Sequence, residues 1–239
     1  TPIYFALGYG HEPAYAYLTA LAFALLGHSL FALRVTSAVC GVLVVAGTYM
    51  VGRALLGRPA AWVAAGWMAV AFWPLSLSRQ ALRAITLPML WLPAVWCTWQ
   101  GLRAAGFTAV GDQRRTRWSQ ALGYGALGGL FLGLSAYTYM ASRVTWLILP
   151  TFALYLLLQR RTRSILRRTW PVLAVALAVG GAVALPLALY LRAHPSAEIR
   201  VDVMMTPIEE LLAGNPEEVL RHTWDALRVY SWVGDRFWA

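Results

Sequence analysis

Long apolar runs follow one another along most of this chain, and they constrain its fold more than any other feature. A helix needs about 20 apolar residues to cross roughly 30 Å of hydrocarbon. The chain is 59% hydrophobic and only 13% charged, and an apolar excess of that size does not fit inside one soluble core. We therefore expect an all-α, polytopic membrane helical bundle. The six predicted spans cover residues 31–55, 60–77, 81–102, 118–138, 143–159 and 169–191.

The arginines predict the orientation of these spans. The chain contains no Lys, so its net charge of +10 comes from Arg. If the six spans are right, 11 Arg and one acid fall on one side of the membrane, and nine Arg and nine acids fall on the other. Cytoplasmic loops carry the excess of positive charge in membrane proteins. This topology explains the basic composition without nucleic acid as a partner.

Two segments flank the predicted bundle of residues 31–191. Residues 1–30 are expected to form an outer loop and a juxtamembrane helix, because the apolar run 13–26 reaches only about 21 Å at 1.5 Å per residue. Residues 192–239 are expected to be an extracytoplasmic helical segment. The chain starts without Met and stops within an aromatic stretch, so we expect both ends to be truncations.

Several functional classes lack the motifs that they require. The two cysteines, Cys40 and Cys97, both lie inside apolar runs and have neither metal-site nor disulfide spacing. The sequence contains no Walker loop, no dinucleotide fingerprint and no Gly-x-Ser-x-Gly elbow. An enzyme that uses ATP or a nucleotide sugar usually carries a soluble domain, and none is visible.

Polar side chains near a membrane are costly unless they face water or a cavity, and several gather at the predicted outer ends of the spans. Arg suits a phosphate because its planar fork donates two parallel hydrogen bonds. Arg79 and Arg83 are four residues apart, and helical spacing is expected to place both guanidinium groups on one face. The candidates are Arg79, Arg83, Tyr139 and Arg143 for the phosphate of a lipid-linked donor, His11 and Glu12 for catalysis, and His194, Arg200 and Asp202 for the acceptor or sugar.

Simpler interpretations of these residues stay open. One alternative is that the arginines anchor helix ends by snorkelling. Tyrosines are common at membrane interfaces, and Glu12 can complement a helix N-terminus. For the whole chain, a transporter or flippase of lipid-linked saccharides and a non-enzymatic membrane protein remain alternatives. A transporter would show internal repeats and polar residues at the midplane, and we see neither.

The order of these segments resembles the family-39-type glycosyltransferases of the GT-C fold, which include protein O-mannosyltransferases and the lipid A aminoarabinose transferase. The ordered set covers nearly the whole chain, and the tail is similar to a bacterial branch of the family. The matching segments are residues 11–15 (HEPAY), 26–34, 52–58, 78–83, 137–143 and 194–239.

The resemblance implies an inverting sugar transfer from a polyprenyl-phosphate-linked donor to a protein, lipid or glycan acceptor. The transfer would occur at the extracytoplasmic face of the bacterial cytoplasmic membrane, and a divalent metal is the one cofactor left open. An essential acid is implied in the first outer loop, which would lie upstream of Thr1. Relatives have His-Pro-Pro or Lys-Pro-Pro where this chain has His11-Glu12-Pro13, so Glu12 departs from the family pattern.

Overall fold

The computed structural model of the chain describes residues 2–5, 10–107, 117–159, 162–194, 207 and 209–228. The chain divides into two compact units. Unit 1 comprises residues 1–5 and 11–190, and unit 2 comprises residues 6–10 and 191–239. Each unit is described by itself below.

Unit 1 is built from helices, as the apolar runs predicted. Its described residues include one isolated backbone bridge, between Phe5 and His11, outside the helices. The helices are α1 (Ala14–Leu26), α2 (Leu30–Leu55), α3 (Arg58–Val70), α4 (Phe72–Arg79), η1 (Arg83–Ile85), α5 (Thr86–Ala104), α6 (Trp118–Ser135), α7 (Ser142–Thr145), α8 (Ile148–Leu158) and α9 (Arg163–Ala193), whose last residues belong to unit 2.

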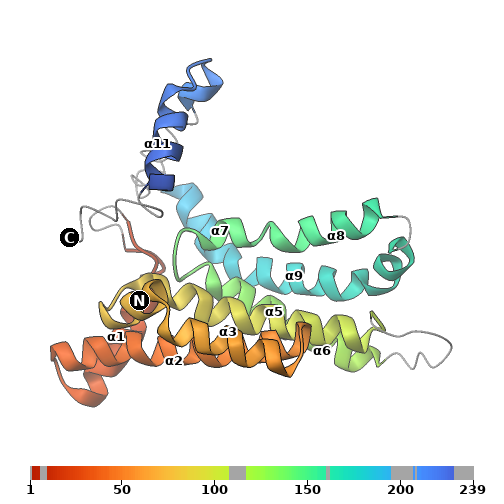
Figure 1. Ribbon diagram of the computed structural model, residues 1–239, viewed down its shortest axis with the longest axis horizontal. Helices are drawn as coiled ribbons and strands as arrows, with labels where there is room; N and C mark the ends of the chain where they lie inside the picture. The colour runs from red at the N-terminus through yellow and green to blue at the C-terminus, as the bar shows by residue number, and fades with distance from the viewer. Residues whose placement is uncertain are drawn as a thin grey trace. The chain divides into compact units, whose positions relative to one another are not determined.

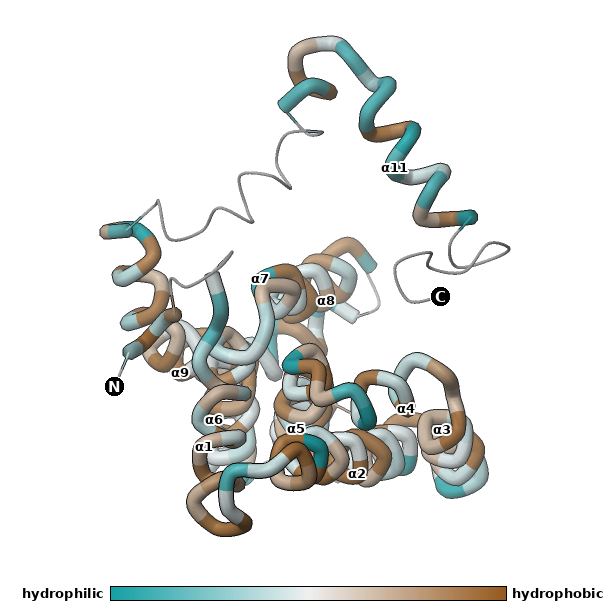
Figure 2. Tube along the Cα trace, turned by 90° about the vertical axis from the view of Figure 1, so that its left-hand side faces the viewer, coloured by the Kyte–Doolittle hydropathy of each residue, from teal (hydrophilic) through white to brown (hydrophobic). Residues whose placement is uncertain are grey.

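The long helices of unit 1 run back and forth along one direction. Figure 1 shows α2, the pair α3–α4, α5, α6, the pair α7–α8 and α9 in alternating directions. Figure 2 looks along these helices and shows α5 between α2 and α6, with α3 on the other side of α2. This up-and-down order is what a polytopic bundle with short connections requires.

Length and apolarity single out two or three membrane spans among the described residues. The helices α2 and α9 are each long and apolar enough to cross a bilayer alone. The pair α3 and α4 qualifies when counted together, although the two helices are bent by 53° at their junction. The remaining predicted spans correspond to α5, α6 and α7–α8, which are shorter or less apolar, so the count of six stays a prediction.

The surface of unit 1 carries many large apolar side chains. Leu25 of α1 and Val63 and Trp67 of α3 are each more than 70% exposed. Soluble monomers rarely expose contiguous apolar surface on this scale. The exposed apolar residues therefore indicate a membrane location.

Small residues bring α5, α6 and α9 into close contact. A Cβ added at Gly101 would lie 2.8 Å from Val172 and 2.9 Å from the Ala121 carbonyl. At Gly133 it would lie 2.6 Å from Val183. Glycine at such positions lets helix backbones approach one another, which drives association in lipid where no hydrophobic force acts between helices.

Unit 2 contains the helix α11 (Glu217–Arg228), which differs from the membrane helices in composition. Glu217 and Glu218 occupy its first turn and Arg228 its last, which matches the helix dipole at both ends. The Asn215 side chain accepts a hydrogen bond from the Glu217 amide at 3.3 Å. Polar and charged residues alternate with Leu220, Trp224 and Leu227, so the helix is amphipathic.

Candidate functional site

Glu12, Arg83 and Tyr139 form a polar cluster in unit 1, which we call the Glu12 cluster. The Arg83 Nη1 donates to the Glu12 Oε2 at 2.9 Å. The Arg83 guanidinium also lies over the Tyr139 ring, 5.4 Å from its centroid, within the range of a cation–π contact. The Glu12 side chain is only 3% exposed and that of Arg83 is 18% exposed. Three segments far apart in the sequence thus meet around one guanidinium group.

Local backbone contacts fix Glu12 in this position. It stands directly before Pro13, which precedes the first residue of α1. The Ala14 amide donates to the Tyr137 carbonyl at 3.0 Å, which attaches the start of α1 to the turn between α6 and α7. The Tyr137 hydroxyl in turn donates to the Val183 carbonyl of α9 at 2.8 Å. These bonds join three separate segments beside the cluster.

The structure does not keep Arg79 and Arg83 on one helix, so that prediction is wrong. The helix α4 ends at Arg79, and Ala81 adopts a left-handed conformation with φ of 59°. Leu82 is extended, and Arg83 begins the separate 3-10 turn η1. This left-handed conformation, which non-glycine residues adopt only at an energetic cost, turns the chain between Arg79 and Arg83. The two guanidinium groups therefore enter different surroundings.

Arg79 lies on an apolar groove between α2 and the α3–α4 pair. The groove has a volume of about 770 Å³, and neither Glu12, Arg83 nor Arg143 lines it. This groove therefore contains only one of the four charged candidates Glu12, Arg79, Arg83 and Arg143.

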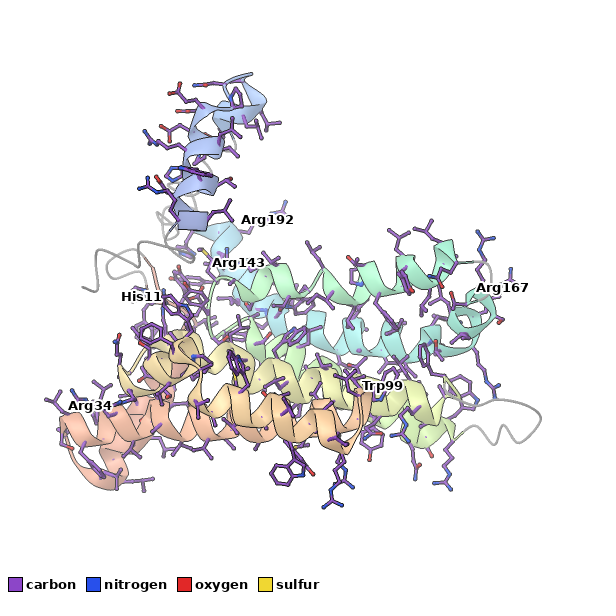
Figure 3. All side chains as sticks on the ribbon, viewed as in Figure 1. His11, Arg34, Trp99, Arg143, Arg167 and Arg192 are labelled. Atoms are coloured by element: carbon purple, nitrogen blue, oxygen red, sulfur yellow. The ribbon has the colours of Figure 1, made fainter. Side chains whose placement is uncertain are left out.

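Two other candidates lie at the same end of unit 1 as the Glu12 cluster. Figure 3 shows His11 and Arg143 at one end of the bundle and Arg167 at the opposite end. His11 and Phe5 exchange backbone hydrogen bonds of 2.8 and 3.0 Å, which fix the loop before α1. Both the His11 and the Arg143 side chains are exposed. Both side chains therefore lie on the surface of unit 1 at this end (Figure 3).

Tyr15 follows the cluster on the first turn of α1. Its hydroxyl is shielded from solvent, and burial raises the pKa of the Tyr15 hydroxyl above its ordinary value. A phenol is already neutral at physiological pH, and burial disfavours its charged form further. Tyr15 can therefore act as a hydrogen-bonding group but not as an anion.

The remaining predicted residues do not join the described cluster. His194 belongs to unit 2 and is exposed. Arg200 and Asp202 lie outside the described residues. Within the described part of the chain, no three His, Cys, Asp or Glu side chains come together as metal ligands would.

Sequence reasoning missed the structural role of Tyr137 and the apolar groove. The sequence assigns Tyr137 no contact with α9, and only the folded chain brings its hydroxyl to the α9 backbone. The groove depends on how α2 and α3 pack, and its lining residues are ordinary apolar side chains. Neither feature has a signal in the one-dimensional pattern.

Comparison with known families covers this same region. A sequence profile described as dolichyl-phosphate-mannose-protein mannosyltransferase matches residues 10–190, which is more than half of the 239 residues. The match contains all three members of the Glu12 cluster. No curated protein and no solved structure matches the chain significantly. The chain belongs to the dolichyl-phosphate-mannose-protein mannosyltransferase family, whose members are membrane glycosyltransferases.

Proposed function

We propose that this protein transfers a sugar from a polyprenyl-phosphate-linked donor to an acceptor at the extracytoplasmic face of the bacterial cytoplasmic membrane. The observation that supports this most is the Glu12 cluster within the family match. Its end of the bundle lies opposite Arg167 (Figure 3), which shares the first turns of α9 with Arg163 and Arg168. The positive-inside rule assigns the arginine-rich end to the cytoplasm, and so the cluster to the outer face.

Arg83 is the central group of the proposed site. Its pairing with Glu12 and its contact with Tyr139 hold the guanidinium in one orientation. A preorganised cation stabilises charge that develops on a leaving phosphate, because no reorganisation is needed during the reaction. Arg143 and His11, exposed at the same end, are proposed to complete the phosphate and sugar contacts.

Glu12 takes a positioning role in this proposal. One of its oxygens already accepts from Arg83, and its side chain has almost no exposed surface for a substrate to touch. The proton acceptor for the incoming hydroxyl or amine is therefore assigned to a different carboxylate. The family resemblance locates that acid in the first outer loop.

The test is transfer from a radiolabelled polyprenyl-phosphate mannose in membranes that contain the protein. Arg83→Gln is expected to lower the rate by about 10²–10³-fold, as the loss of one preorganised donor does in other enzymes. Arg83→Lys keeps the charge but not the planar fork and should recover part of the rate. Arg34→Gln removes an exposed arginine of α2 and should leave the rate unchanged.

The outcome separates the three functional classes. Wild-type transfer by a well-folded Arg83→Gln protein would remove Arg83 from the site. Movement of a lipid-linked saccharide across vesicles without any covalent transfer would favour the flippase alternative. Absence of both activities, across several sugars, would favour a non-enzymatic membrane protein.

A further inference from the structure

The groove between α2 and the α3–α4 pair has walls that suit a hydrocarbon chain. Its volume is about 770 Å³. On α2 the lining positions recur at helical spacing, from Ala38 through Val42 and Val45 to Tyr49. Val42 is 68% exposed, so the groove opens on the lipid-facing side of unit 1. Hydrocarbon from the bilayer therefore has direct access to it.

The groove is separate from the Glu12 cluster. Cys40 and Val44 of α2 pack into the buried core with Ile85, the residue that ends η1. Ala38, Val42 and Val45 belong to a different face of the same helix, because successive residues of an α-helix are rotated by about 100° around its axis. The chain reversal at Ala81 places Arg83 on the cluster and Arg79 on the groove.

One end of the groove is cationic. Arg79 is the only charged residue among those that line it, and Ser78 adjoins it. Arg79 is exposed at the end of α4, and no lining residue is acidic. A guanidinium at the mouth of an apolar groove matches an anionic headgroup attached to an apolar tail.

The length of the groove fits the acyl chain of a phospholipid better than the chain of a polyprenyl phosphate. On α2 it runs from Ala38 to Met50, which is about 18 Å at 1.5 Å per residue. One leaflet occupies about 15 Å, half of the roughly 30 Å hydrocarbon core. A single phospholipid acyl chain reaches about that depth. A polyprenyl chain, built from many isoprene units, exceeds it. The pair of Tyr49 and Trp62, with ring centroids 4.9 Å apart, lines the end away from Arg79.

We infer that this groove binds an anionic phospholipid of the membrane, with one acyl chain along α2 and the headgroup phosphate on Arg79. The site takes a resident lipid rather than the sugar donor, and it lies apart from the proposed catalytic groups. The bound lipid fills the space beside the bent junction of α3 and α4, where two helices otherwise leave an apolar surface open.

Native mass spectrometry of the purified full chain tests the inference. The protein is titrated separately with phosphatidylglycerol, phosphatidylcholine and a polyprenyl phosphate. We expect one tightly bound phosphatidylglycerol, and about tenfold weaker binding in Arg79→Gln, because a hydrogen bond to a charged group is lost. Ala46→Trp places a large ring on the exposed wall of the groove and should abolish binding while the headgroup contact stays intact.

Matched variants control for general effects. Arg34→Gln removes an exposed arginine of α2 outside the groove, and Val39→Trp adds a ring to an exposed position of the same helix outside the groove. Both should bind phosphatidylglycerol as the wild type does, and melting curves should be alike for all variants. Weaker binding in Arg79→Gln and loss of binding in Ala46→Trp, with neither change in the controls, supports the site.

Three results would overturn it. Wild-type affinity in either Arg79→Gln or Ala46→Trp would show that the lipid binds elsewhere. Equal affinity for phosphatidylcholine would show that the charge on the headgroup does not matter. Displacement of phosphatidylglycerol by the polyprenyl phosphate, with the same dependence on Arg79, would assign the groove to the donor and leave the proposed transferase activity standing.

Discussion

At the scale of single residues, the Glu12–Arg83 ion pair is the interaction most sensitive to substitution. The Glu12 carboxylate is almost completely buried, and its partner keeps a small exposed surface. A buried charge that loses its partner retains the desolvation penalty without the compensating attraction. Removal of one member of the pair is therefore expected to lower the stability of the protein more than removal of both.

A double-mutant cycle on this pair makes the argument measurable. Arg83→Gln alone is expected to destabilise the protein by about 3 kcal/mol, because it leaves the buried Glu12 carboxylate unpaired. The combination of Glu12→Gln with Arg83→Gln should recover a large part of that loss. Thermal unfolding in detergent measures both. Strictly additive effects of the two changes would contradict the coupling.

Tyr139 offers a second prediction at this scale. Its ring faces the Arg83 guanidinium, and a cation–π contact of this kind contributes about 0.5–1 kcal/mol at partly exposed sites. Tyr139→Leu should therefore weaken donor use by about two- to fivefold, measured as kcat/KM with a polyprenyl-phosphate sugar. Tyr139→Phe keeps the ring and should stay near the wild-type value. Equal losses in both would show that the hydroxyl, not the ring face, matters.

At the scale of elements, the glycines of α6 decide how closely the neighbouring helices approach. A Cβ at Gly129 would collide with the Ala176 carbonyl of α9, and one at Gly133 would collide with Val183. Carbonyl groups of a helix backbone cannot move aside as a flexible side chain can. The packing of α6 on α9 therefore tolerates no larger residue at these positions.

Gly129→Ala tests this packing against a control on the same helix. We expect a loss of about 1–3 kcal/mol from overpacking, seen as a lower melting temperature in detergent. At Gly123 an added Cβ meets nothing within 4 Å, so Gly123→Ala should be neutral or slightly stabilising through its helix propensity. A stable Gly129→Ala protein would mean that α6 and α9 are not packed as described.

The broken pair α3–α4 shows how an element can depart from its apolar pattern. Residues 60–77 were predicted as one span, and the structure interrupts the helix at Ala71. Pro74 lacks the amide that would donate to the Val70 carbonyl, and its ring crowds that carbonyl. Pro93, Pro171 and Pro186 lie inside continuous helices, so the presence of Pro alone did not identify the break.

At the scale of the whole molecule, the two ends of unit 1 carry different sets of functional candidates. His11 and Arg143 lie at one end and Arg167 at the other (Figure 3). If the chain inserts according to the positive-inside rule, the end with Arg167 faces the cytoplasm. The proposed site then faces the outside, where a lipid-linked sugar would be used.

Cysteine labelling in intact cells tests this topology. After replacement of Cys40 and Cys97 by Ala, a single cysteine is introduced at Gln80 or at Gln159. Both residues are exposed and follow the C-terminal ends of α4 and α8, two helices that run in opposite directions. A membrane-impermeant maleimide should label Gln80→Cys directly, and Gln159→Cys only after permeabilisation. The reverse pattern would place the Glu12 cluster in the cytoplasm and exclude the proposed site of transfer.

The sequence by itself determined the all-helical class, the helix α1 before the first long helix and the membrane location. These follow from the lengths and apolarity of local segments, which act within one element at a time. It also identified Glu12, Arg83 and Tyr139 as separate candidates. Their chemical types and their positions at helix ends are properties of single residues, and those are visible in one dimension.

Only the tertiary structure decided which of these residues meet. The reversal at Ala81 sends Arg83 to Glu12 and Arg79 to the groove, although the two arginines are only four positions apart. Such a partition depends on the packing of α1, α2 and the turn before α7, and the Glu12–Arg83 hydrogen bond by itself joins residues that are 71 positions apart. No local pattern encodes contacts over that distance, because they arise from the simultaneous burial of several helices.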